Sequence, residues 1–405
     1  MQSTIKSVSL PAITMGALAA FVGYAASFTI VLAGLDAMGA SQQQAATGLF
    51  AATLGMSVCS VWLALKTRTP AAVAWSTPGA AFLASTTLLP GGFPAAIAAF
   101  IICAVLLMAT GFVPALAQLV SRTPKAVANA LLAGVLLKLC LAPALAIGTV
   151  PLLFLPVFIA WLIGLLWHRL AAMPFAVLAF IAVLVYTVNT GETVQTPLLT
   201  DNKSLLGGLS PVMPQFSLTA TISVAIPLYL ITMAGQNIPG FAVLELNGFK
   251  VNRQPLLITT GFASLLLAPF GSIPVNMSAI TAAMMCGEDV GEDPGVRYQA
   301  AVTCGLVFMV FAFAAGALTQ LAVAAPTELI VAVAGLALLP ALAASLTAAF
   351  SDNTQIEAPA LTFLLAASGM TLFGIGGAFW AIVTGVIVWW LKYLKNANNH
   401  KDIQN

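Results

Sequence analysis

Long apolar runs, separated by short clusters of polar residues, proline and glycine, dominate the chain from end to end. A hydrocarbon layer about 30 Å thick is crossed by roughly 20 apolar residues in a helix. The pattern predicts an all-α polytopic membrane protein of fourteen transmembrane segments, seven on each side of a polar stretch from Thr190 to Gln215. The expected segments are 11–33, 42–65, 70–90, 94–120, 125–147, 150–167, 170–189, 217–242, 254–270, 272–287, 298–322, 327–349, 358–375 and 376–394.

Composition agrees with a chain whose outer surface meets lipid. Of 405 residues 60% are hydrophobic and only 6% are charged, whereas roughly 25% are charged in an ordinary soluble domain. The net charge of +2 comes without a basic stripe, so no nucleic-acid partner is expected. There is no P-loop, histidine cluster or metal-ligand spacing, and we therefore expect neither an enzyme nor a cofactor. The five cysteines are interpreted as buried small hydrophobes.

The basic residues predict how the chain is oriented in the membrane. In this scheme nearly all of them fall on one side, which the positive-inside rule places in the cytoplasm. Lys203 lies in a loop on the other side, and Lys138 lies within a segment. Both termini are therefore expected in the cytoplasm. The residues on the cytoplasmic side are Lys6, Lys66, Arg68, Arg122, Lys125, Arg169, Lys250, Arg253, Arg297, Lys392, Lys395 and Lys401.

The third and tenth segments are both interrupted. Thr69–Gly79 and Ala268–Ser278 each begin with extended-type residues, then combine a proline with a residue that favours a helix start. Because each half has an odd number of segments, the second half is an inverted copy, and interrupted segments at matched positions are typical of a transporter binding site. We expect Thr77 and Asn276 to cap the two half-helices. The alternative is a pair of proline-kinked helices without a ligand.

The two expected helix starts favour an anionic ligand. Each start carries about half a positive charge and several unpaired N–H groups, so two converging starts could hold one carboxylate without a buried arginine. Segment eight adds an amide pair in an apolar run, which needs partners in hydrocarbon unless it serves helix packing alone. Aromatic side chains nearby could contact a ring. The candidate substrate-binding residues are Tyr24, Ser27, Trp75, Ser76, Thr77, Gly79, Gln236, Asn237, Asn276, Met277 and Ser278.

Lys138 is the one basic residue placed well inside a predicted segment. A charge at the centre of a membrane helix costs about 2.5–3.5 kcal/mol on insertion scales and is a functional hypothesis by default. The alternative is that the side chain snorkels to the outer surface. The sequence leaves both open.

Three motifs, Ala74–Ala81, Met233–Gly240 and Ala367–Trp380, resemble the benzoate–proton symporter family, BenE, and the resemblance runs from Gly16 to about Trp390. It implies the fold of the nucleobase–ascorbate and sulphate-type anion transporters, which are commonly homodimers whose core domain moves like an elevator against a gate domain. On this resemblance, the core comprises 1–122 and 217–323, the gate 123–190 and 324–395, the extracytoplasmic loop 191–216 and the cytoplasmic tail 396–405.

The resemblance implies import of an aromatic carboxylate, benzoate, together with protons. Nucleobase relatives place acids beside the substrate, whereas this chain has Gln236, Asn237 and Asn276 in the matching stretches. Amides can donate hydrogen bonds to a carboxylate, but the change removes the obvious proton carrier. Either an acid at the membrane edge or the substrate itself would then carry the proton. The alternatives in function are a facilitative anion conductor and a proton-coupled nucleobase-like transporter on the same fold.

Overall fold

The computed structural model describes residues 9–113, 115–116, 118, 124–168, 171–190, 209–323, 326–352 and 355–402. Residues 191–208 of the predicted polar loop, with Lys203, lie outside the described residues, as do Lys6, Arg122 and Arg169. The described chain is mostly helical. Helices long and apolar enough to cross a membrane span Leu10–Ala37, Gln42–Thr67, Gly92–Phe112, Lys125–Thr149, Leu218–Leu246, Pro294–Gln320, Thr327–Ala349 and Gly377–Leu394.

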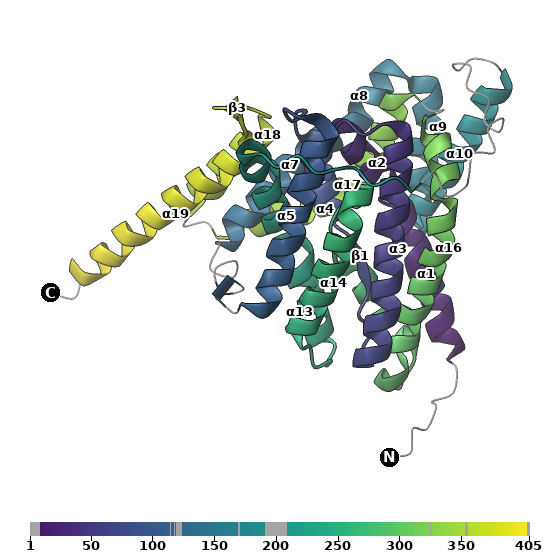
Figure 1. Cartoon of the computed structure of the whole chain (residues 1–405), viewed down its shortest axis with the longest axis horizontal. Coiled ribbons are helices and arrows are strands. Elements are labelled where there is room, and N and C mark those ends of the chain that lie inside the picture. Colours follow the sequence, from purple (N-terminus) through teal and green to yellow (C-terminus); the bar gives the residue numbers. More distant parts are fainter. Residues whose placement is uncertain are drawn as a thin grey trace.

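The first half of the chain alternates long helices with one short strand (Figure 1). Its elements are α1 (Leu10–Ala25), α2 (Phe28–Ala37), α3 (Gln42–Thr67), β1 (Val73–Trp75), α4 (Thr77–Ser85), α5 (Gly92–Phe112), α7 (Lys125–Cys140), α8 (Ala142–Thr149), α9 (Pro151–Trp167) and α10 (Ala172–Thr190).

The second half has a similar order of elements. They are α11 (Leu218–Ala220), η1 (Thr221–Ala225), α12 (Ile226–Thr232), η2 (Met233–Asn237), α13 (Ile238–Leu246), α14 (Arg253–Leu267), η3 (Ala268–Phe270), β2 (Val275–Met277), α15 (Ala279–Cys286), η4 (Glu288–Val290), η5 (Pro294–Val296), α16 (Tyr298–Val323), α17 (Thr327–Ala349), α18 (Glu357–Ala367), β3 (Thr371–Leu372), β4 (Ile375–Gly376) and α19 (Gly377–Asp402).

The helix from α11 to α13 contains two wide, π-helical turns, η1 and η2. Each ends two residues before a proline, Pro227 or Pro239. A proline has no N–H to give to the carbonyl four residues earlier, and a turn closed by a five-residue hydrogen bond relieves that mismatch. The Ile238 N–H accordingly donates to the Met233 carbonyl. The widened turn changes which side chains face the neighbouring helices, and it carries the amide pair predicted from the sequence.

One group of helices packs closely through small residues. α3 and α1 both pack against α16, and α5 packs against α14; in Figure 1, α1, α3, α14 and α16 stand side by side. At Gly305 of α16 an added Cβ would lie 2.9 Å from the Ser57 carbonyl, and Ser57 Oγ donates to the Gly305 carbonyl at 2.7 Å. Close backbone approach and interhelical hydrogen bonds are how helices associate in lipid, where apolar surface alone gives no preference.

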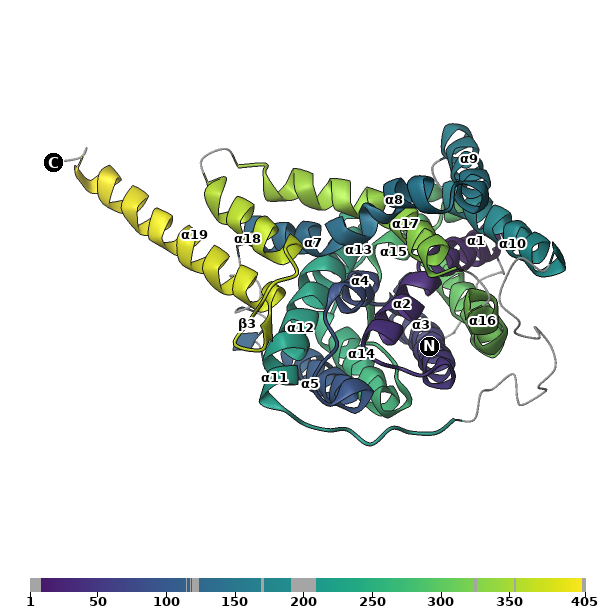
Figure 2. The same cartoon turned by 90° about the horizontal axis from the view of Figure 1, so that it is seen from above.

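A second group of helices lies along one edge of the molecule. α7 packs against α17 and α18, α9 packs against α10, and α18 packs against α19. Figure 2 shows α18, α7, α8 and α17 in a row beside the first group, with α19 extending away. Lys392 of α19 forms an ion pair with Glu357 at the start of α18.

The prediction of a continuous segment over 358–375 is wrong. Its helix, α18, stops at Ala367 and is followed by a hairpin in which β3 pairs with β4. Gly369 has a φ of 63°, which ends the helix, and the turn residues Phe373 and Gly374 have φ of 54° and 73°. Ser223 of η1 holds the hairpin, because its Oγ accepts from the Gly376 N–H at 3.3 Å. The last helix also differs, since α19 continues beyond the expected end at 394 to Asp402.

Candidate functional site

The two interrupted segments meet as a small antiparallel ladder inside the helical bundle. β1 pairs with β2 so that Val73 faces Met277, Ala74 faces Asn276 and Trp75 faces Val275. One more hydrogen bond extends the ladder at each end. The Ser76 N–H donates to the Pro274 carbonyl at 2.9 Å, and the Ser278 N–H donates to the Ala72 carbonyl at 3.0 Å. The extended stretches expected from the sequence are therefore confirmed.

The outer edges of the ladder are satisfied by two serines in equivalent roles. Ser60 Oγ of α3 accepts from the Val73 N–H at 3.0 Å and donates to the Val73 carbonyl at 3.2 Å. Ser264 Oγ of α14 accepts from the Val275 N–H at 2.9 Å, and its hydroxyl lies 2.7 Å from the Thr260 carbonyl and 3.3 Å from the Val275 carbonyl. Unpaired backbone groups are costly where water is absent, and these serines remove that cost at both edges.

The predicted helix caps are wrong by one and by two residues. Ser76, not Thr77, caps α4, because its Oγ accepts from the Gly79 N–H at 3.1 Å. Ser278, not Asn276, caps α15, with its Oγ accepting from the Thr281 N–H at 3.3 Å. The physical reason is the ladder: its hydrogen bonds keep the backbone extended until each serine.

The two helix starts face each other across the ladder. The ladder partner of Ser278 is Ala72, four residues before Ser76. At about 3.3 Å per strand residue, the two helix starts are therefore about 13 Å apart along the ladder. Because the strands are antiparallel and each leads into its helix, α4 begins beyond one end of the ladder and α15 beyond the other, so the two positive helix ends flank the strands. Gly79 belongs to this frame, since an added Cβ would lie 2.6 Å from Ser76 Oγ.

The helix from α11 to α13 contacts both halves of the ladder, through Thr232 at the end of α12 and Asn237 at the end of η2. Thr232 Oγ1 is 2.8 Å from Ser76 Oγ in a hydrogen bond, and Asn237 Oδ1 accepts from the Met277 N–H at 3.0 Å. Gln236 lies between these two contacts in sequence. It is 7% exposed, and its side-chain amide makes no hydrogen bond among the described residues. Gln236 is therefore a largely buried amide in η2, the turn that contacts β2.

Asn276 carries a second unsatisfied group. Its Nδ2 donates to the Met277 carbonyl at 3.0 Å, while its buried Oδ1 has no partner among the described residues. Buried polar atoms are nearly always paired, and an exception indicates a missing partner such as a ligand or a water. The facing residue, Ala74, is only partly buried although its neighbours Val73 and Trp75 are buried. The face that carries Ala74 and Asn276 is therefore partly exposed at Ala74 and fully buried at Asn276.

An aromatic cluster covers the first crossover. Tyr24 contacts Trp75 at 5.0 Å between ring centroids, Phe28 at 5.9 Å and Phe311 at 4.8 Å. Trp75 Nε1 donates to Ser27 Oγ at 2.8 Å, so these two predicted site residues are paired with each other. The Tyr24 hydroxyl lies near Thr53 but forms no hydrogen bond of normal geometry.

The sequence of this chain matches a known protein family. The sequence model of the benzoate membrane transport protein family, BenE, matches residues 6–391. The chain belongs to the BenE family. BenE is a family of membrane transport proteins and not of enzymes. A BenE relative, the Escherichia coli inner membrane protein YdcO, is 34% identical over 94% of this chain and 95% of its own. The benzoate membrane transport protein of Acinetobacter baylyi is 29% identical over 95% of each chain.

The fold of this BenE chain is similar to the solved structures of anion transporters. The transmembrane domain of the cyanobacterial bicarbonate transporter BicA is similar with a TM-score of 0.59 and 12% identity, over 93% of this chain and 97% of its own. The murine anion transporter Slc26a9 in its inward-facing state is similar with a TM-score of 0.62 and 12% identity, over 97% of this chain and 69% of its own. At such identity the likeness concerns the fold alone.

The structure does not bring every predicted residue of the BenE chain to the ladder. Lys138 is exposed and lies in the last turn of α7, near Cys140, where a cation suits the helix dipole. Sequence reasoning also missed Ser60, Ser264 and Thr232. Their signal is weak, because single serines and threonines in apolar helices usually bond to the preceding turn.

Proposed function

We propose that this chain is a secondary transporter of the inner membrane that imports an aromatic carboxylate, benzoate, with both termini in the cytoplasm. Family membership and the names of the relatives support the substrate class and the membrane. The observation that carries the proposal is Gln236, a nearly buried amide in η2, the turn whose Asn237 holds β2 between the two helix starts. Together these groups offer donors and positive potential to one carboxyl group.

In this proposal the carboxyl group lies over the middle of the ladder. Gln236 donates to one carboxyl oxygen, and the starts of α4 and α15 act from either side at a distance of about 6 Å each. Thr77 flanks the group. Met277 and Trp75 project from the opposite face of the ladder to Asn276, and with Tyr24 they support the ladder from behind. Ser27, Ser76, Gly79, Asn237 and Ser278 hold this arrangement through the hydrogen bonds and close contacts described above.

Proton coupling follows most simply if the substrate carries the proton. Asn276 Oδ1 is a buried acceptor without a partner. The carboxylate binds first, to Gln236 and the two helix starts, with its lone pairs toward Asn276 Oδ1. A proton that follows converts the group to the acid, which donates its O–H to this oxygen. One carboxylate and one proton then cross together as the acid, and no acidic side chain of the protein needs to titrate.

For alternating access we propose an inverted repeat and an elevator motion of a core against a gate, in a homodimer. The repeat is supported by the matched roles of Ser60 and Ser264 and of Ser76 and Ser278. The division is supported by the packing of α1, α3, α5, α14 and α16 with one another and of α7 with α17 and α18.

The test is uptake of labelled benzoate into proteoliposomes, with and without an inward proton gradient, against uracil. Empty liposomes are subtracted, since protonated benzoate crosses lipid unaided. We expect protein-dependent, gradient-driven accumulation of benzoate and none of uracil. Equilibration without accumulation would replace symport by facilitated conduction, and transport of uracil alone would replace the substrate.

The Gln236→Leu variant tests the site within this assay. A hydrogen bond to a charged group contributes about 1.5–3 kcal/mol, so its half-saturation concentration for benzoate should rise roughly 10- to 100-fold. Gln254→Leu, at the exposed start of α14, is the matched control and should transport as wild type. Unchanged uptake by Gln236→Leu would remove this amide from the site.

A further inference from the structure

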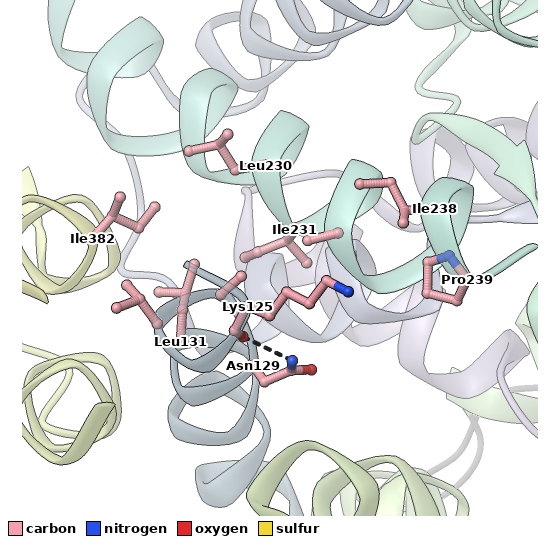
Figure 3. A pocket seen from close by; sticks show the side chains of 11 residues that line it. Lys125, Asn129, Leu131, Leu230, Ile231, Ile238, Pro239 and Ile382 are labelled. Atoms are coloured by element: carbon pink, nitrogen blue, oxygen red, sulfur yellow. Dashed lines mark hydrogen bonds between the residues drawn. The ribbon is translucent and has the colours of Figure 1, made fainter. Parts of the chain in front are cut away.

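A cavity of about 300 Å³ lies between α7 and the α12–α13 helix, apart from the candidate site. Its wall is largely apolar, with Leu131 of α7, Ile231 and Ile238 of the facing helix, and Ile382 of α19. Lys125 and Asn129 supply the polar groups (Figure 3). An apolar cavity of about 300–1,000 Å³ with a few polar groups is typical of small-molecule sites.

Lys125 is an unusual residue for its position. It is the first residue of α7, where a positive charge is disfavoured by the helix dipole. Figure 3 shows its side chain extending across the cavity toward Pro239 on the opposite wall. Among the described residues no carboxylate forms an ion pair with its ammonium group. The ammonium and the helix start therefore add two sources of positive potential without a negative partner.

The cavity adjoins the candidate site through a shared stretch of helix. Ala234 and Ile231 line the cavity, and they neighbour Gly235 and Thr232, which contact the start of α4. An added Cβ at Gly235 would lie 3.4 Å from Pro78 of α4. A ligand that leaves the ladder toward the Lys125 end of α7 would therefore enter this cavity next.

We propose that this cavity is a second binding site for the aromatic carboxylate, at the end of the path that the basic residues place in the cytoplasm. Lys125 pairs with the carboxylate, and the apolar wall formed by Leu131, Ile231 and Ile238 holds the ring. At cytoplasmic pH the acid released from the ladder gives its proton to water and becomes the carboxylate that Lys125 binds. That the ligand is an aromatic carboxylate rests on the proposed function. The cation, the cavity volume and the apolar wall are observed independently of it.

The first experiment compares transport from each side of the membrane. Benzoate uptake is measured in right-side-out and inside-out vesicles for wild type, Lys125→Met, Lys125→Arg and Lys138→Met. Lys125→Met should raise the half-saturation concentration roughly fivefold on the cytoplasmic face alone, the effect of one partly exposed ion pair. Lys125→Arg keeps the charge and should stay near wild type. Lys138→Met removes a charge from the opposite end of the same helix and should change nothing.

The second experiment detects binding directly, without transport. Ala128 lines the cavity, so Ala128→Cys is labelled with a maleimide in a Cys140→Ser background, the other cysteines being buried. Benzoate should slow labelling severalfold, uncharged benzamide should not, and Lys125→Met should abolish the protection. Protection that persists in Lys125→Met, or no protection at all, would overturn the proposal. A wild type that transports no benzoate would refute the proposed function, while this labelling still reports on the cavity.

Discussion

The two strand–helix crossovers share a backbone frame and differ in their side chains. In each, a serine of a neighbouring helix holds the strand edge and another serine caps the half-helix. In the first crossover the polar side chains of the strand and of the cap are paired, Trp75 with Ser27 and Ser76 with Thr232, whereas the hydroxyl of Tyr24, which packs on Trp75, is buried without a partner among the described residues. In the second, Asn276 keeps a buried oxygen without a partner.

This difference teaches that two crossovers with matching backbone contacts can differ in how their polar side chains are paired. The paired residues of the first crossover fix the position of the ladder and of the aromatic cluster. The buried oxygen of the second has no partner among the described residues, and we propose a ligand as its partner. A mutation in the first crossover should therefore lower stability, and one in the second should weaken ligand binding. A negative charge added at a helix start is the exception, because it should weaken binding equally in either crossover.

The largest effect is expected from a negative charge at either helix start. Thr77 and Ala279 are the first residues of α4 and α15. Thr77→Asp and Ala279→Asp would each place a charge about 8 Å from the proposed carboxyl group, a repulsion of about 2 kcal/mol at an effective dielectric constant of 20. Benzoate binding in detergent should weaken roughly 30-fold in both. A difference above tenfold between the two variants would move the carboxyl group toward one crossover, and normal binding in both would refute the dipole argument.

A smaller effect is expected where the α12–α13 helix holds each crossover. Asn237→Leu leaves the buried Met277 N–H without an acceptor, which should lower the free energy of unfolding by about 1–2 kcal/mol. Thr232→Val removes one partner of Ser76, which still accepts from Gly79, so the loss should stay near 1 kcal/mol. Thermal unfolding in detergent compares the variants. Equal losses would mean that the two contacts contribute alike.

The smallest effect is expected at the aromatic cluster. Ser27→Ala leaves Trp75 Nε1 without its acceptor and should destabilise the protein by about 1 kcal/mol with little change in benzoate affinity. A double-mutant cycle with Trp75→Phe isolates the pair, and we expect a coupling of at least about 0.5 kcal/mol. Strongly weakened benzoate binding in Ser27→Ala with unchanged stability would instead make Ser27 a direct ligand, as the sequence predicts.

The sequence predicts the broken segments well because their causes are local. Proline, glycine and serine at fixed spacing interrupt a helix wherever they occur, and the third and tenth segments were located by that pattern alone. The caps were missed because two candidate residues stand within two positions of each other at each start. The choice between them depends on the ladder register, which joins residues about 200 positions apart and leaves no local signal.

The surroundings of a side chain are harder to predict than the helix that carries it. Lys138 lies within the span Lys125–Thr149, as the sequence predicts, because α7 continues through Leu141 into α8. That its side chain is exposed is seen only in the structure. In the sequence, Lys125 is one of several basic residues at a segment edge, and only the tertiary structure places it beside a cavity. Phe311 likewise reaches Tyr24 from α16, and no sequence period links the two.

The ladder also has a consequence for biosynthesis. β1 has no pairing partner until β2 has been made, roughly 200 residues later, which at 5–20 residues per second is about 10–40 s of synthesis. Through that interval the first strand would present unpaired N–H and C=O groups to lipid. Until β2 is made, the first half must therefore be kept away from lipid, for example beside the insertion machinery. Neither half should fold when it is made alone.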